Sequence, residues 1–304
     1  MKLKHNINIK AYLALIAAII IWGLSFVATK VALKGFTTFT LIFGRFGLAA
    51  VLFLALMPRY GFPRFTRKDH GMIFLTALFE PGLYFIFETF GLQYTTAPEA
   101  SLIIAAIPIS VLVLAYLLLG ERSGFADLFG IVVSVLGIIL LITGSPDFSW
   151  DLSGHLLGDL LIIGAVITAS LYITSARSLG KTYSAFEITS MQSIYGALFY
   201  LPAFLWEFPR MKWSAVSGAS VGALVFLTLF ATVGAFLCYN YALTKVPATR
   251  AAVFTNGIPV VTVVAACILI GEKLSLIQAG GGTLVLLGVC LTNFIKLPGR
   301  IKEL

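Results

Sequence analysis

The chain has 304 residues, of which 59% are hydrophobic and only 11% are charged. Soluble proteins carry about 25% charged residues, so this composition excludes a soluble domain and indicates a protein that crosses a membrane repeatedly. The net charge of +8 does not indicate a nucleic-acid partner, because the basic residues are distributed over alternate connections between apolar segments.

Apolar segments of about 20 residues, the length of a helix that crosses about 30 Å of hydrocarbon, follow one another along the chain. The first apolar run is too long for the core of a signal peptide, so we expect a retained helix there. The sequence predicts ten spans, at residues 11–33, 37–57, 71–93, 97–119, 125–144, 156–176, 185–206, 215–239, 248–270 and 276–295.

Lys and Arg residues are unevenly distributed between the two sides of these spans. Most fall on the side of the N-terminus. The opposite side carries Lys30, Lys34, Arg210, Lys212 and Lys273. Positively charged connections tend to remain in the cytoplasm. The sequence therefore predicts a multi-pass protein of the cell inner (cytoplasmic) membrane with both termini in the cytoplasm.

One sequence pattern occurs twice. Residues 117–121 (LLLGE) recur 151 residues later as 268–272 (ILIGE), and the same offset relates Pro108 to Pro259, Gly130 to Gly281 and Gly137 to Gly288. We therefore expect two five-helix repeats, 11–144 and 156–296. Because each repeat holds an odd number of spans, the second is predicted to be inverted in the membrane, as in many secondary transporters.

Features that both repeats share are expected to build the scaffold. The paired glycines lie seven residues apart, on one helix face, and favour close helix packing. The two Gly-Glu pairs, at 120–121 and 271–272, are expected to cap the start of the helix that follows each of them.

Polar residues within spans are the main functional candidates, because each costs free energy in hydrocarbon unless it is satisfied. In the third span, Thr76, Glu80, Tyr84 and Glu88 recur every four residues and are predicted to form one stripe along a helix. Arg45 in the second span lies between the two acids in depth. One acid is expected to pair with Arg45. The other is left for a substrate ammonium group or a coupling proton.

The acid stripe has no counterpart in the second repeat. Glu80 and Glu88 align with Ala231 and Tyr239, and Arg45 aligns with Gln192. A feature present in only one repeat is more simply explained by function than by architecture.

Pro108 and Pro259 lie at the centres of spans four and nine. A proline inside a helix removes one backbone hydrogen bond, and matched helix breaks at the membrane centre point to a transport site. Asn256 adds an amide beside the second break. We expect these residues to line the site, with a simple packing kink as the alternative.

Further candidates for the cavity lining are aromatic or amide side chains within spans. Trp22 lies in the middle of its span, which excludes a role as an interface anchor; Tyr172 lies in span six, and Tyr239 and Asn240 close span eight. We expect Asn240 at an inner gate. Residues 93–95 (QYT), at the end of span three, are candidates for an outer gate.

The chain resembles the ten-helix, EamA-like branch of the drug/metabolite transporter (DMT) superfamily over residues 11–296. The resemblance rests on Trp22-Gly23 with Lys30, on residues 43–45 (FGR), and on the segment from 92–97 (LQYTTA) through Pro108 to Glu121, which recurs from 243–248 (LTKVPA) through Pro259 to Glu272. It implies a 5+5 inverted-repeat bundle around a central cavity that opens alternately to each side. Members export amino acids, related metabolites or toxic organic compounds.

These observations predict a secondary active transporter, an exporter of small polar metabolites such as amino acids, with proton coupling left open. Its expected partners are a small-molecule substrate, protons and the lipid bilayer; we expect no cofactor, metal or nucleic acid. Alternative substrates are drugs, organic cations, sugar phosphates or lipids. A membrane-embedded enzyme is disfavoured, because no cluster of catalytic groups is visible. A passive channel is the third alternative, and saturable counterflow would separate a transporter from it.

Overall fold

The computed structural model describes residues 8–94, 103–144, 156–270 and 275–294, and these residues form helices and turns without a strand. The helices are α1 (Ile9–Ala32), α2 (Thr38–Tyr60), α3 (Arg67–Ala77), α4 (Tyr84–Tyr94), α6 (Ile107–Leu119), α7 (Phe125–Thr143), α8 (Leu156–Leu179), α9 (Ala185–Glu207), α10 (Gly218–Phe226), α11 (Ala235–Lys245), α12 (Ala248–Thr255), α13 (Gly257–Ile270) and α14 (Leu276–Phe294). Two π-helical segments, η1 (Leu78–Leu83) and η4 (Leu227–Gly234), join α3 to α4 and α10 to α11; two short turns, η2 (Phe208–Arg210) and η3 (Trp213–Ala215), follow α9.

Local sequence sets several helix ends. Ser184 and Glu187 form a reciprocal capping box at the start of α9, which satisfies backbone N–H groups that lack partners inside the helix. The start of α2 is capped from another helix, since Thr40 N donates to Glu207 Oε2 at 2.9 Å. At the ends of α2 and α6, Gly61 and Gly120 adopt φ angles of 97° and 66°, which other residues rarely adopt.

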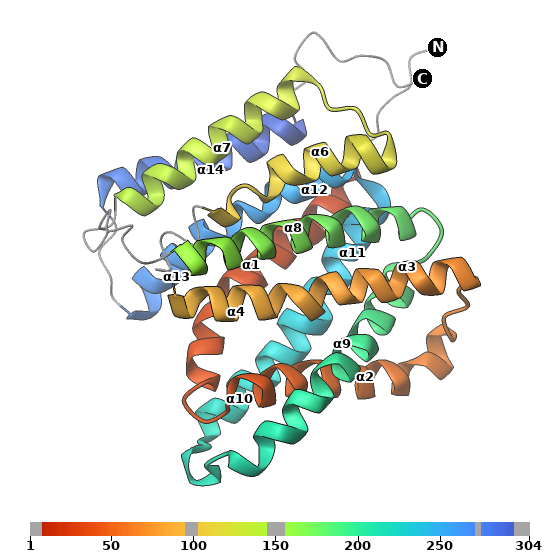
Figure 1. Ribbon diagram of the computed structural model, residues 1–304. Coiled ribbons are helices and arrows are strands. Elements are labelled where there is room, and N and C mark those ends of the chain that lie inside the picture. Colours follow the sequence, from red (N-terminus) through yellow and green to blue (C-terminus); the bar gives the residue numbers. More distant parts are fainter. Residues whose placement is uncertain (1–7, 95–102, 145–155, 271–274, 295–304) are drawn as a thin grey trace.

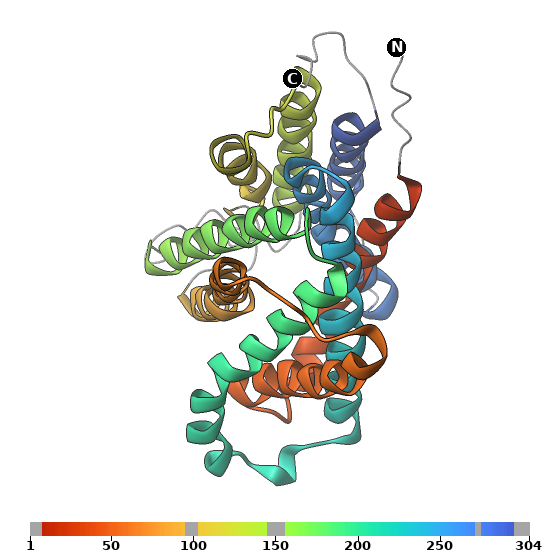
Figure 2. The same ribbon diagram turned by 90° about the vertical axis from the view of Figure 1, so that its right-hand side faces the viewer.

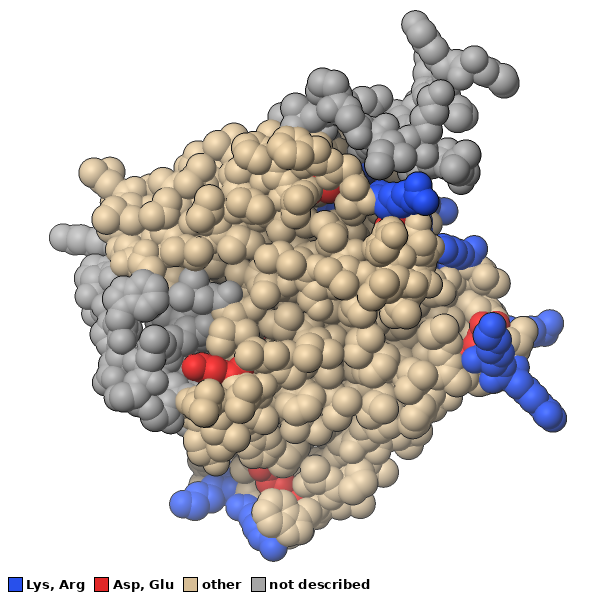
Figure 3. All heavy atoms as spheres, turned by 45° about the horizontal axis from the view of Figure 1, so that its top comes forward, with Lys and Arg blue, Asp and Glu red and all other residues tan. Residues whose placement is uncertain are grey.

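Eight helical stretches of the described residues are long and apolar enough to cross a membrane. Of the other two predicted spans, α6 is a shorter apolar helix of 13 residues, and α9 spans 23 residues but contains a run of buried polar side chains. Apolar side chains such as Val51, which is 65% exposed, cover the outside. Figure 3 shows a broad surface with few charged atoms between basic groups at opposite edges. The all-helical membrane fold is therefore confirmed.

The closest helix pair is α7 with α14, which lie side by side in Figures 1 and 2. An added Cβ at Gly130 would lie 2.7 Å from Gly288 O, and one at Gly137 would lie 2.7 Å from Gly281 O. These glycines therefore let the two backbones touch, as the packing interpretation predicted.

The remaining helices pack around α1, α8 and α9. α1 contacts α11 and α13, while α8 contacts α4 and α6. α9 packs along α2, and both also reach a π-helical segment, α2 touching η4 and α9 touching η1. The largest buried cluster contains Leu15, Tyr172, Phe236, Tyr239 and Leu243, so the core lies where α1, α8 and α11 meet.

Several spans are broken near their centres. Turns at residues 105–106 and at Asn256 interrupt spans four and nine just before Pro108 and Pro259, as the prolines predicted. Span three differs from expectation. It is not one regular helix, because Glu80 has extended backbone angles (φ −147°, ψ 117°) where Pro81 interrupts the chain. The four-residue stripe from Thr76 to Glu88 is therefore divided into two parts.

Candidate functional site

A buried hydrogen-bond network joins α8, α9 and α11. Tyr172 OH donates to Asn240 Oδ1 at 3.1 Å, and Asn240 Nδ2 donates to Thr189 Oγ1 at 2.9 Å and to Gln192 Oε1 at 3.2 Å. Asn240 and Thr189 are fully buried. Asn240 therefore connects three helices inside the bundle, and its role at an inner gate stays a prediction.

The broken third span is held by side chains of α9. Gln192 Nε2 donates to Glu80 O at 2.6 Å, and Tyr200 OH lies 3.0 Å from Pro81 O and 2.8 Å from Gly82 O. Non-helical backbone at membrane depth is tolerated only when protein groups or water satisfy it. Gln192 and Tyr200 supply those donors.

Sequence reasoning did not select Pro81, Gln192 or Tyr200 as site residues. The Pro-Gly step at 81–82 was the available signal, because such a dipeptide marks a turn. Gln192 was noted only as the counterpart of Arg45. Its contact with Glu80 joins residues 112 positions apart, which no local pattern reveals.

Trp22 and Tyr239 lie together beside this network. Trp22 Nε1 donates to Ala231 O in η4 at 3.1 Å. Its ring centroid is 5.1 Å from that of Tyr239 and 5.3 Å from that of Phe236. Tyr172 also contacts Phe236, with centroids 6.1 Å apart. Three of the predicted cavity residues, Trp22, Tyr172 and Tyr239, thus belong to one aromatic group around Phe236.

The two acids of span three have different surroundings. Tyr84 OH donates to Glu88 Oε1 at 3.0 Å, and the charge of Arg45 attracts Glu88. Arg45 Nε donates to Thr232 Oγ1 at 3.2 Å, and its guanidinium lies 5.3 Å from the centroid of the Phe85 ring. Arg45 and Glu88 thus attract one another electrostatically, but the expected direct ion pair is absent from the described contacts.

Glu80 has no such compensation. Within the described part of the chain, its carboxylate accepts no hydrogen bond and forms no ion pair. It is half-buried and close enough to Tyr172 and Tyr239 for electrostatic interaction with both hydroxyl groups. The site therefore contains one acid with partners and one without.

Other predicted site residues lie elsewhere. Asn256 Nδ2 donates to Ser134 Oγ of α7 at 3.0 Å, so this amide serves the packing of α12 on α7. Pro108 is buried and Pro259 is half-buried, and both start helices beyond the breaks. Of the proposed outer gate, Tyr94 is 50% exposed, while the side chains of residues 93 and 95 lie outside the described residues.

An ion-pair cluster joins the two repeats at the ends of α6 and α8. Arg177 Nε lies 2.9 Å from Glu121 Oε1, and Arg177 Nη1 donates to Leu243 O at 2.8 Å. Glu121 Oε2 accepts from Ala248 N at 2.9 Å. Glu121 therefore caps α12, not the next helix along the chain as expected; α7 is capped by Asp127. Glu272 lies outside the described residues.

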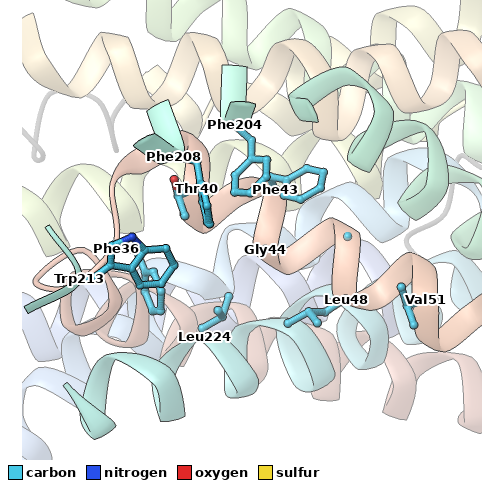
Figure 4. A pocket seen from close by; sticks show the side chains of 11 residues that line it. Phe36, Thr40, Phe43, Gly44, Leu48, Val51, Phe204, Phe208, Trp213 and Leu224 are labelled. Carbon is cyan, nitrogen blue, oxygen red and sulfur yellow. The ribbon is translucent and has the colours of Figure 1, made fainter. Parts of the chain in front are cut away.

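An apolar hollow of about 410 Å³ opens between α2, the end of α9 and α10. The rings of Phe43, Phe204 and Phe208 gather on one side of it (Figure 4), and Phe43 stacks on Phe204 with centroids 4.2 Å apart. No predicted site residue lines this hollow. Its exposed Leu48 and Val51 identify a lipid-facing surface outside the polar network.

The chain matches the model of the EamA-like transporter family twice, over residues 9–143 and 156–294. The chain belongs to the EamA-like transporter family. Its relatives include an uncharacterized transporter of Archaeoglobus fulgidus, 31% identical over 92% of this chain and 97% of that protein. The uncharacterized transporter YetK of Bacillus subtilis is also 31% identical, over 94% of this chain and 87% of that protein.

A relative with a more specific name is a probable terminal-alkyne amino-acid exporter of Streptantibioticus cattleyicolor. It is 25% identical, over 97% of this chain and 96% of that protein. A solved crystal structure superposes with a TM-score of 0.78 at 18% identity, covering 92% of this chain and 95% of the other, which supports the fold alone. This EamA-like protein is thus a multi-pass membrane transporter of a small molecule, not an enzyme.

Proposed function

We propose that this EamA-like transporter exports small polar metabolites, with amino acids as the first class to test, by alternating access across the inner membrane. The observation that carries the proposal is the polar network around the break in span three, which binds the main chain of Glu80 and lies in the same interrupted span as the bonded carboxylate of Glu88. Ionisable groups within membrane spans mark substrate or proton pathways. The name of the Streptantibioticus relative makes amino acids the natural starting point.

The 5+5 inverted repeat is supported by the contact between α7 and α14. Gly130 meets Gly288, the repeat counterpart of Gly137, and Gly137 meets Gly281, the counterpart of Gly130. Such an exchange of contacts is the signature of a two-fold axis between equivalent elements. Because residue numbers rise in one helix as they fall in the other, the equivalent helices run antiparallel, which favours inverted repeats.

Contacts across the centre follow the same exchange. Arg45 of α2 donates to Thr232 in η4, while its counterpart Gln192 of α9 donates to Glu80 in η1. Each repeat thus supplies the residue that reaches the interrupted span of the other. Motion of one repeat against the other would change both contacts together, as rocking about a central site requires.

The ion pairs at one end support a closed inner side. Glu121 and Asp127 belong to the first repeat, and their partners Arg177 and Arg250 belong to the second, at 2.9 and 3.7 Å. The positive-inside distribution assigns this end and both termini to the cytoplasm. In this proposal the pairs separate when the inner side opens.

Transport of the protein in liposomes tests the proposal. Vesicles preloaded with unlabelled amino acids should accumulate radiolabelled amino acid by counterflow, which saturates for a carrier and not for a channel. Imposed pH gradients should drive uptake if protons are coupled. We expect Glu80→Gln and Glu88→Gln to reduce transport or remove its pH dependence. Unchanged transport and pH dependence in both variants would eliminate the acids from the mechanism.

A further inference from the structure

The hydroxyl group of Tyr239 has no partner. The side chain is 0% exposed, and its oxygen has no hydrogen-bond partner among the described residues. Burying a hydroxyl group without a hydrogen bond costs free energy. Phe236, one turn earlier on α11, contacts the same Trp22 ring without such a group. Packing alone therefore does not explain the hydroxyl of Tyr239.

Among the described residues, Glu80 is the acid that acts electrostatically on this hydroxyl, and Gln192 bonds both the main chain of Glu80 and Asn240, the neighbour of Tyr239. Glu80 interacts electrostatically with Tyr239 and with Tyr172, and its own backbone oxygen is already occupied by Gln192. The main chain and the side chain of Glu80 therefore have different surroundings. Its main chain is anchored to α9, and its half-buried carboxylate has no hydrogen bond or ion pair among the described contacts.

The other charged groups nearby do not compensate Glu80. Arg45 is attracted to Glu88 and bonded to Thr232, and Glu88 is close enough to Glu80 to repel it. The hydroxyl of Tyr172 already donates a hydrogen bond to Asn240. A negative charge in low dielectric without a cation is costly, so the site is electrostatically incomplete.

We propose that Glu80, Tyr239 and Trp22 form the subsite that binds a protonated amino group of the transported molecule. The carboxylate supplies the counter-charge, the Tyr239 oxygen accepts an N–H hydrogen bond, and the ring of Trp22 offers a π face to the cation. Glu88 has no part in this contact. The assignment rests on the proposed transport function, because it uses the same central network.

The rings of Trp22 and Phe236 also set the chemistry of the ligand. They present apolar surface next to Tyr239, so an amine carrying a small apolar or aromatic group fits better than a polyamine. An uncharged analogue would leave the carboxylate buried and unpaired, and is therefore expected to be excluded.

Fluorescence of Trp22 provides a direct test. Replacing Trp150, Trp206 and Trp213 by Phe leaves Trp22 as the only indole. Titration of this purified protein with 2-phenylethylamine should change its emission saturably, whereas 2-phenylethanol, of similar shape but uncharged, should not. Glu80→Gln should weaken amine binding about tenfold to hundredfold, the range expected for a charge-assisted hydrogen bond. Tyr239→Phe should weaken it less.

The outcomes separate this inference from the proposed function. Equal binding of the amine to the Glu80→Gln variant and its parent, equal binding of amine and alcohol, or no saturable response would overturn the subsite. The last result would leave a proton as the occupant of Glu80. Amino-acid counterflow by the same protein is measured in a separate experiment. Transport without amine binding would refute the subsite alone, and amine binding without transport would refute the proposed function alone.

Discussion

Two adjacent glycines of α14 provide a matched test of the packing between the repeats. An added Cβ at Gly281 would lie 2.4 Å from Leu141 N and 2.7 Å from Gly137 O, whereas one at Gly280 would meet nothing within 4 Å. We expect Gly281→Ala to destabilise the protein and Gly280→Ala to leave its stability unchanged or slightly increased.

The magnitude follows from what the new methyl group meets. Both substitutions share the gain in helix propensity, about 1 kcal/mol in a soluble helix, so this contribution cancels in their difference. At Gly281 the clashing atoms belong to the backbone of α7 and cannot rotate away. The helices must therefore separate by about 1 Å to restore carbon contacts of about 3.5 Å. Overpacking of this kind costs about 1–3 kcal/mol.

Unfolding by SDS in mixed detergent micelles, followed by far-ultraviolet circular dichroism, measures this difference. The free energy of unfolding should be about 1–3 kcal/mol lower for Gly281→Ala than for Gly280→Ala. Equal stabilities would refute the reasoning, because they would mean that α7 and α14 do not touch at Gly281. A large loss in both variants would contradict the open surroundings of Gly280.

Three further variants test the polar contacts. Asn240→Leu removes three buried hydrogen bonds at about 0.6 kcal/mol each in membrane proteins and should lower the free energy of SDS unfolding by about 2 kcal/mol; a loss below about 0.5 kcal/mol would show that the network adds little to stability. Glu121→Gln keeps an acceptor for Ala248 N but loses the charge facing Arg177, and should lower the free energy of unfolding by about 1.5–3 kcal/mol. If exchanging the charges of residues 121 and 177 fully restored stability, the cap on α12 would contribute nothing. Tyr200→Phe removes the donor to the carbonyls of the interrupted span, so we expect reduced counterflow at nearly normal expression, and full activity would contradict its role in holding the break.

The sequence predicted the helices well where apolar length alone decides them. The expected spans 125–144 and 276–295 correspond to α7 and α14 within one residue at each end. Two successes came from the repeat, since breaks preceded both Pro108 and Pro259 and the paired glycines lie in the contact between α7 and α14. The repeat revealed these features because each of them occurs at equivalent positions in both halves of the chain.

The prediction of a regular helix for span three was wrong, because two local patterns overlap there. A polar residue every fourth position made span three resemble a regular helix, although Pro81 interrupts it directly after Glu80. The sequence could not decide which acid associates with Arg45, because Arg45 lies between the two acids in depth. Only the packing of α2 against η4, with Arg45 bonded to Thr232, brings the guanidinium toward Glu88.

Polar groups inside the bundle are mostly hydrogen-bonded, and the groups that lack a partner among the described residues are the candidates for function. Gln192, Tyr200 and Asn240 each occupy acceptors or donors that a broken helix would otherwise leave open. A membrane protein that satisfies even the carbonyls of its breaks has no structural need for an acid and a phenol without partners. Tyr239 is such a phenol, and the half-buried carboxylate of Glu80, unpaired among the described contacts, interacts with it electrostatically from the other repeat. A protonated amine that enters from outside the protein would supply a counter-charge for Glu80 and a hydrogen-bond donor for Tyr239, as the proposed subsite requires.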